Sequence, residues 1–150
     1  MRVLLTVFAA ASLALAPLGV ASAESVSKKQ IADILANQGY PVRDFDRNMV
    51  AVVVSDHVVL VGVDGADGDV TYLTFLSGVS GSTLSFDFLN KFNNEVKFGR
   101  AYVDRDGDVA IQMDRNAAGG VSAENIESDF DVFLLLISKF LSDLESQTIA

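Results

Sequence analysis

Aspartates are concentrated in two short glycine-containing segments, and these side chains have the clearest potential for binding chemistry. They are Asp64, Asp67, Asp69, Asp104, Asp106 and Asp108. Carboxylate oxygens are the ligands that Ca²⁺ prefers, and the second segment has the spacing of the first three ligands of an EF-hand loop. In that loop, however, Gly107 falls at the fourth position instead of the sixth, and Arg115 stands where glutamate is required. Aspartate and glycine are also what tight turns between strands need. We expect structural turns and no cofactor; a weak cation site is the alternative.

Catalytic chemistry finds little support in the sequence. His57 is the only histidine, and a catalytic triad needs a nucleophile held within hydrogen-bond reach of its base. No Gly-x-Ser-x-Gly segment supplies that nucleophile, and the chain contains no cysteine. We interpret His57 as a residue of a turn between two apolar strands and expect a protein that is not an enzyme.

The first residues have the pattern of a secretory signal peptide. Arg2 precedes an apolar run, Val3 to Ala16, which is followed by Pro17 and by small residues at positions 21 and 23. The run is shorter than the roughly 20 residues that a membrane-spanning helix needs. We therefore expect residues 1–23 to be removed and residues 24–150 to form one exported domain, periplasmic or fully secreted, without stable membrane insertion.

The charge of the chain limits its partners. The formal net charge is −9, and loss of Arg2 with the signal peptide would make it −10. Such a surface repels nucleic acid and anionic lipid, so neither is expected as a partner. Because there is no cysteine, stability must rest on packing alone.

Hydrophobic periodicity predicts a single α+β domain of the order α-βββ-α-ββ-α, with a five-stranded antiparallel sheet packed with helices. The expected helices span residues 28–38, 86–94 and a long segment capped by Ser122; the expected strands span residues 49–54, 58–63, 70–76, 97–103 and 109–114. Ser27 and Gln30 have the spacing of a capping box for the first helix, and Gly39 is placed to end it. The first two strands are apolar on both faces, so we expect both faces of the sheet to be covered.

The register of the second hairpin follows from its side-chain pattern. If Gly107 forms a left-handed bulge, Asp104 opposes Asp108 and the apolar side chains of both strands share one face. A slip of one residue would mix polar and apolar residues on each face. The pattern therefore predicts the bulged turn.

The long C-terminal helix carries a core stripe and additional apolar residues behind it. The stripe consists of Ile126, Phe130, Phe133, Ile137, Phe140 and Leu144, at spacings of three and four residues. Val132, Leu135 and Leu136 lie around the back, with Leu135 about 180° from the stripe. Monomeric proteins usually avoid such exposed apolar patches, so we expect a second subunit to cover these residues in a homodimer.

A second possible contact surface lies on the hairpin. Phe98, Arg100 and Tyr102 are expected on the face opposite the core, with Asp114 diagonal to Arg100. Aromatic and arginine side chains are enriched in protein interfaces.

Motifs between residues 89 and 121 resemble those of the YbjN family, whose members are classed as bacterial sensory-transduction regulators. The residues that carry the resemblance are Leu89, Asn90, Phe92, Asn93, Phe98, Gly99, Arg100, Ala101, Tyr102, Asp104, Asp106, Gly107, Asp108, Met113, Asp114, Gly119, Gly120 and Val121. Phe92 stands where the family usually has tryptophan. The resemblance implies a fold similar to type III secretion chaperones, which are small acidic homodimers, and it implies no catalytic residues. Those chaperones work in the cytoplasm, so the signal peptide argues against a role in guarding secreted effectors.

Together these features favour a non-enzymatic, exported interaction module, a homodimer that binds a protein of unknown identity in a regulatory or chaperone-like manner. The alternative is a periplasmic protein that binds a small ligand or cation through its aspartate-rich turns. An exported hydrolase would need an acid and a base that the sequence does not pair.

The signal-peptide interpretation predicts the N-terminus of the exported protein. The intact mass of protein recovered from the periplasm should correspond to a chain that begins at Glu24. Full-length chain retained in the inner membrane would contradict cleavage.

Overall fold

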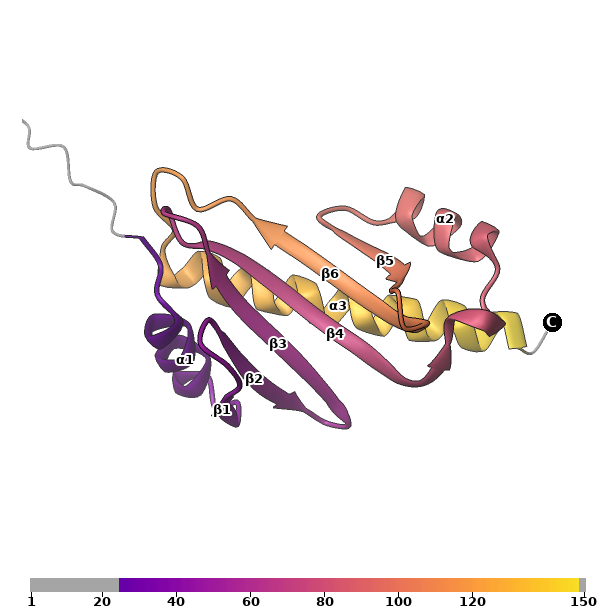
Figure 1. The fold of residues 1–150 in the computed structure, drawn as a ribbon, viewed down its shortest axis with the longest axis horizontal. Helices are drawn as coiled ribbons and strands as arrows, with labels where there is room; N and C mark the ends of the chain where they lie inside the picture. Colours follow the sequence, from indigo (N-terminus) through magenta and orange to yellow (C-terminus); the bar gives the residue numbers. More distant parts are fainter. Residues whose placement is uncertain (1–24, 149–150) are drawn as a thin grey trace, which may run out of the picture.

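The computed structural model describes residues 25–148 and contains helices and one sheet (Figure 1). In chain order the elements are α1 (Lys28–Asn37), β1 (Val42–Asp44), β2 (Met49–Val54), β3 (His57–Asp64), β4 (Asp69–Ser80), a 3₁₀ turn η1 (Gly81–Thr83), α2 (Phe86–Glu95), β5 (Gly99–Val103), β6 (Asp108–Arg115) and α3 (Ala123–Thr148). The predicted signal peptide lies outside the described residues. Within residues 25–148, no helix combines the length and the apolar character needed to cross a membrane.

The sheet has six strands, one more than predicted. Its order is β1-β2-β3-β4-β6-β5, and neighbouring strands are antiparallel. The additional strand, β1, pairs with β2 through Val42 opposite Val52 and Asp44 opposite Val50. β1 follows Pro41 and contains a single apolar residue, so its sequence has no alternating pattern that would predict a strand. It forms because the backbone groups at the edge of β2 are free to pair with it.

Element boundaries differ modestly from those predicted. The predicted strand 97–103 begins only at Gly99, and β4 continues to Ser80, four residues beyond the predicted end. His57 is the first residue of β3, paired with Val54, instead of a turn residue.

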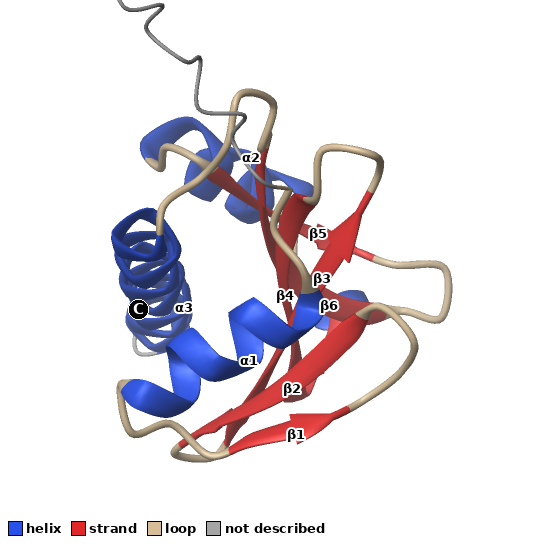
Figure 2. Ribbon diagram, turned by 90° about the vertical axis from the view of Figure 1, so that its left-hand side faces the viewer, coloured by secondary structure: helices blue, strands red, loops and turns tan. Residues whose placement is uncertain are grey.

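Helices cover one face of the sheet and leave the other open. In Figure 2, α1 and α3 lie on the same side of the strands, α2 lies at one end, and no α-helix lies on the opposite side. The expectation that both faces are covered is therefore wrong for a single chain. The face away from α3 is called the open face below.

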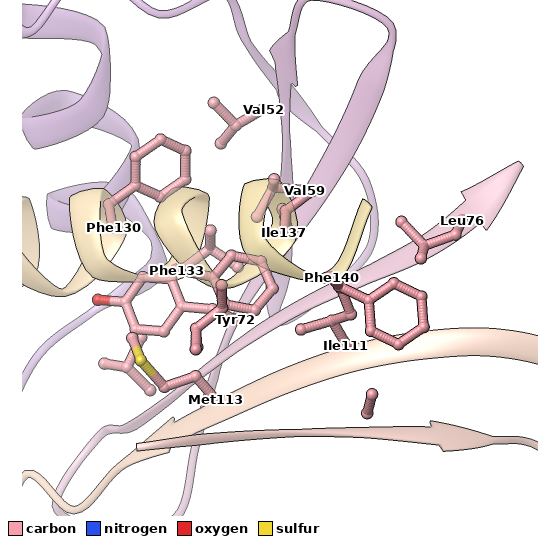
Figure 3. Close-up of a cluster of buried hydrophobic side chains, with 14 of the residues drawn as sticks. Val52, Val59, Tyr72, Leu76, Ile111, Met113, Phe130, Phe133, Ile137 and Phe140 are labelled. Carbon is pink, nitrogen blue, oxygen red and sulfur yellow. The ribbon is translucent and has the colours of Figure 1, made fainter. Parts of the chain in front are cut away.

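The core lies between α3 and the covered face of the sheet (Figure 3). Phe130, Phe133 and Phe140 are fully buried, as the periodic stripe predicts. Tyr72, on the central strand β4, has its ring centroid 5.9 Å from that of Phe133, and Thr74 on the same face donates a hydrogen bond to a backbone carbonyl instead of facing water. Burying aromatic side chains of this size is the main stabilising contribution.

Capping and turn residues have the predicted roles. Ser27 and Gln30 form the capping box of α1, and Gly39 follows that helix with a φ of +90°. Gly107 also has a φ of +90°, and the amide of Asp104 donates to the carbonyl of Asp108 at 2.9 Å. The bulged register of the β5–β6 hairpin is therefore confirmed.

The side chain of Asn93 attaches α2 to the edge strand β5. Its amide nitrogen donates to the carbonyl oxygen of Ala101 at 3.0 Å, and its amide oxygen accepts from the backbone N–H of Ala101 at 2.8 Å. One amide side chain thus takes the place of a neighbouring strand and satisfies part of an exposed sheet edge.

Asn93→Ala should lower the free energy of unfolding by about 1–3 kcal/mol, because both backbone groups of Ala101 would lose their partner. Denaturant-induced unfolding, followed by circular dichroism, measures this change. Asn90→Ala is the matched control, since Asn90 is an exposed residue of the same helix with the same change in helix propensity. Equal effects of the two substitutions would contradict the role given to Asn93.

Candidate interaction surfaces

An exposed apolar patch forms where α3 passes the start of β5. It consists of Phe98, Val132 and Leu135, and we call it the α3 patch. Phe98 is 77% exposed and Leu135 is 68% exposed, whereas Val132 is half-buried. Two adjoining grooves, of about 510 and 590 Å³, both have Phe98 and Val132 in their walls. The patch therefore joins a residue of the predicted hairpin row to the predicted back of the long helix.

The predicted row of Phe98, Arg100 and Tyr102 is not observed, because Phe98 lies apart from the other two residues. Phe98 lies outside β5 with a φ of +70°, which is a rare conformation for a bulky side chain, and it faces α3. A side chain at the next position, Gly99, would overlap Leu136. The chain therefore approaches α3 closely at Gly99, and this approach ends the alternation of faces before Phe98.

Leu136 is also placed differently from the prediction. It is only 6% exposed and packs against Gly99 of β5. Leu136 is rotated by about 100° from Leu135 along the helix, toward the edge of the sheet. Of the three residues predicted behind the core stripe, Leu136 thus belongs to the core, while Val132 and Leu135 remain at the surface.

The open face carries an apolar row that crosses five strands. Its members are Val53, Val58, Phe75, Ala110 and Tyr102 on β2, β3, β4, β6 and β5. The pairing of Val59 with Thr74 places Val58 opposite Phe75 at the next position of the register. Val58 is 47% exposed and Phe75 is 41% exposed, so the row reaches the surface at its centre. The apolar second face of these strands was the sequence signal for this row, although only Tyr102 among its members was predicted as a contact residue.

A polar cluster lies beside this row. The carboxylate of Asp114 accepts hydrogen bonds from Arg100 at 3.0 Å, from Gln112 at 2.8 Å and from Thr71 at 2.9 Å. The Tyr102 hydroxyl donates to Gln112 at 3.0 Å, and the Arg100 guanidinium lies 5.9 Å from the Tyr102 ring centroid. The predicted proximity of Arg100 and Asp114 is therefore observed.

The cluster keeps Asp114 ionised. Partial burial pushes the pKa of Asp114 upward, but the hydrogen bonds from Gln112 and Thr71 and the charge of Arg100 outweigh it and hold the pKa below its usual range. A carboxylate held in this way by three donors is suited to fixing the positions of its neighbours and poorly suited to accepting a proton.

Three carboxylates of the aspartate-rich turns accept hydrogen bonds within the fold. Asp104 accepts from the amides of Asp106 and Asp108, both at 2.9 Å. Asp69 accepts from the amide of Ala117 at 2.8 Å, and Asp64 accepts from the side chain of Asn48 at 3.0 Å. Among the described residues, no three acidic or histidine side chains are grouped in a way that could hold a metal ion.

Several of the residues between positions 89 and 121 that carry the family resemblance stabilise the fold between α2 and α3. Phe92 is buried with its ring centroid 5.1 Å from that of Phe140, Asn93 binds β5, and Gly107 forms the hairpin bulge. Gly119 and Gly120 both have positive φ in the turn before α3, whereas Asn90 is exposed on α2.

A family model described as "YbjN: Putative bacterial sensory transduction regulator" matches residues 27–146. The chain belongs to the YbjN family. The match covers every helix and strand described above apart from the last residues of α3. No curated protein sequence matches the chain.

Two solved structures have a similar fold. The crystal structure of YbjN from E. coli, described there as a putative transcription regulator, has a TM-score of 0.64 at 14% identity, over 80% of this chain and 92% of that chain. The Yersinia pestis type III secretion chaperone SycH, solved in complex with a stable fragment of YscM2, has a TM-score of 0.54 at 16% identity, over 77% of this chain and 97% of that chain. The predicted chaperone-like α+β fold is confirmed, with a sixth strand.

From its hydrogen bonds we predict that the β5–β6 turn is stabilised by Asp104 and does not require a bound cation. Asp104→Ala should lower the free energy of unfolding by about 1–2 kcal/mol, because two backbone amides lose their acceptor. Asp106→Ala is the control, and its effect should be smaller. Calcium titration should leave the melting temperature of the wild type unchanged, since a ligand selective for the folded state would raise it. A calcium-dependent rise that Asp104→Ala abolishes would contradict this interpretation.

Proposed function

We propose that the mature protein is an exported, non-enzymatic homodimer of the cell envelope that binds another protein in a regulatory or chaperone-like manner. The family description concerns a sensory transduction regulator, and the structural neighbour SycH is a chaperone solved with a protein fragment. Export rests on the signal-peptide pattern of residues 1–23, and the periplasm is the compartment that this pattern favours.

The observation that carries the proposal is the apolar row on the open face. A sheet face that is not covered by helices is normally polar, because alternate side chains then face water. Here Val58 and Phe75 present apolar surface at the centre of the sheet, and Val53 and Tyr102 continue it on both sides. Contiguous apolar surface of this kind typically marks a site of protein interaction.

The chemistry of the open face fits a protein better than a small ligand. Small-molecule sites are concave and enclose most of their ligand, whereas this row extends across five strands of a sheet. Tyr102 ends the row and Arg100 lies beside it, and arginine and tyrosine are among the residues that contribute most to protein interfaces. The hydrogen bonds from Arg100 to Asp114 and from Tyr102 to Gln112 hold both side chains in place before a partner arrives.

Homodimer formation is supported by a separate surface, the α3 patch. Phe98 and Leu135 lie on the helix side of the domain and cannot be covered by a partner bound to the open face. A second subunit at the α3 patch would remove this apolar surface from water and leave the open face accessible.

Capture experiments with matched variants test the role of the open face. Residues 24–150 are immobilised and exposed to an envelope extract as the wild type, as Phe75→Lys and as Phe86→Lys. Phe86 is 89% exposed on α2 and lies outside the open face, so Phe86→Lys is the control for loss of an exposed phenylalanine. The wild type and the control should retain the same protein, and Phe75→Lys should bind it at least about 30-fold more weakly when the purified pair is measured by calorimetry. Equal binding by all three chains would contradict the proposal.

A further inference from the structure

The side of α3 that faces away from the sheet carries a continuous exposed stripe. Its residues are Glu124, Ser128, Asp131, Leu135, Ser138 and Ser142. At about 100° per residue these positions fall within roughly 80° of one another, on the side of the helix opposite the buried phenylalanines. Leu135 is the only large apolar side chain in the stripe and lies near its middle.

We propose that this stripe binds the same stripe of a second copy, with the two α3 helices antiparallel and the two-fold axis at Leu135. The inference rests on the homodimer of the proposed function and specifies its interface. Two-fold interfaces use one surface twice, so residues on one side of the axis must match residues on the other side.

The sequence around Leu135 meets this requirement. In an antiparallel pair with the axis at Leu135, a residue a given number of positions before Leu135 faces the residue the same number of positions after it in the partner. Asp131 of each copy is then level with Lys139 of the other copy, so two pairs of opposite charges form, one on each side of the axis. Ser128 lies opposite Ser142 close to the contact line, and these short side chains allow the helices to approach closely.

Other arrangements of the same helices are less favourable. A parallel pair would place Asp131 against Asp131. An antiparallel pair with its axis at Ser138 would place Asp131 against Glu145 and Leu135 against Leu141, which is already half-buried in its own subunit. Like charges facing each other weaken helix pairs, so of these three arrangements the charges favour the antiparallel pair with its axis at Leu135.

Contacts next to the stripe place charged and apolar groups where a second copy could bind them. Lys139 bonds to Asp143 at 2.8 Å and to Glu95 at 3.1 Å, which holds its ammonium group beside the stripe. Asp131 is exposed and forms no ion pair with any residue in the described part of the chain. Phe98 and Val132 border the same grooves next to Leu135, so a helix docked on the stripe would also cover the α3 patch.

Charge exchange tests the geometry directly. In sedimentation equilibrium of residues 24–150 at micromolar concentration, the wild type should be dimeric. Asp131→Lys and Lys139→Asp should each weaken the homodimer by at least about tenfold, because each variant places two pairs of like charges across the axis. An equimolar mixture of the two variants should form a heterodimer of near wild-type affinity, since both opposite-charge pairs are restored. The double variant Asp131→Lys/Lys139→Asp should recover the homodimer for the same reason.

Matched controls separate the geometry from net charge and from stability. Asp56→Lys and Lys29→Asp make the same changes in net charge at exposed sites outside the stripe, and they should leave the dimer unchanged and show no preference for each other. Leu135→Asp should give a monomer with the circular dichroism spectrum of the wild type. If Leu135→Asp unfolds, the charge-exchange experiment alone tests the α3 interface.

The outcomes distinguish this inference from the proposed function. A wild-type dimer that is insensitive to charge reversal at Asp131 and Lys139 would overturn the α3 interface and leave the homodimer in place. A monomeric wild type would overturn both the interface and the homodimer. Binding of a protein partner through Phe75 is measured separately and does not depend on either result.

Discussion

The contact between the phenylalanine stripe of α3 and one face of the sheet holds the other elements in position. The ring centroid of Phe130 lies 4.9 Å from that of Tyr40, three residues after the end of α1, and Phe130 also faces Tyr72 on the central strand β4. One turn from the end of the stripe, Phe140 makes edge-to-face contacts with Phe88 and Phe92 of α2. Each buried phenylalanine contributes roughly 1.5–3 kcal/mol, and these two connect both shorter helices to the long one. α1 and α2 also contact the sheet, but they hardly touch each other, so the α3 stripe is what links these two helices.

The same contact explains why the molecule has an apolar open face. A two-layer domain covers each sheet face only where it has a helix layer to pack there, and here α1 and α3 lie on the same face. β2 and β3 nevertheless contain runs of valine that place apolar side chains on both faces, such as Val52 toward α3 and Val53 away from it. The fold alone would permit polar residues at the positions of Val58 and Phe75. Their apolar character is therefore better explained by a partner than by the stability of the single chain.

Sequence predicted those features that depend on periodicity within one element. The stripe of α3 and the bulged register at Gly107 could be read from the chain because a wrong phase would place polar residues in the core. Features that depend on a neighbouring element could not be read in this way. β1 forms only because β2 has a free edge, and Leu136 is buried only because β5 approaches at Gly99. The positive φ of Phe98 follows from the same approach, so the predicted row with Arg100 and Tyr102 missed the grouping of Phe98 with Val132.

The positions of the two surfaces have a consequence for the proposed dimer. The exposed stripe of α3 faces away from the sheet, and the open face is directed away from α3. Two copies joined through their stripes would therefore carry their open faces on opposite outer sides of the dimer. Neither the row around Phe75 nor the cluster around Asp114 would be used in dimer formation, so dimerisation and partner binding would not compete. Such a dimer can hold two partner molecules, or two segments of one partner, and the gain in effective concentration at the second site would make modest affinity at each open face sufficient.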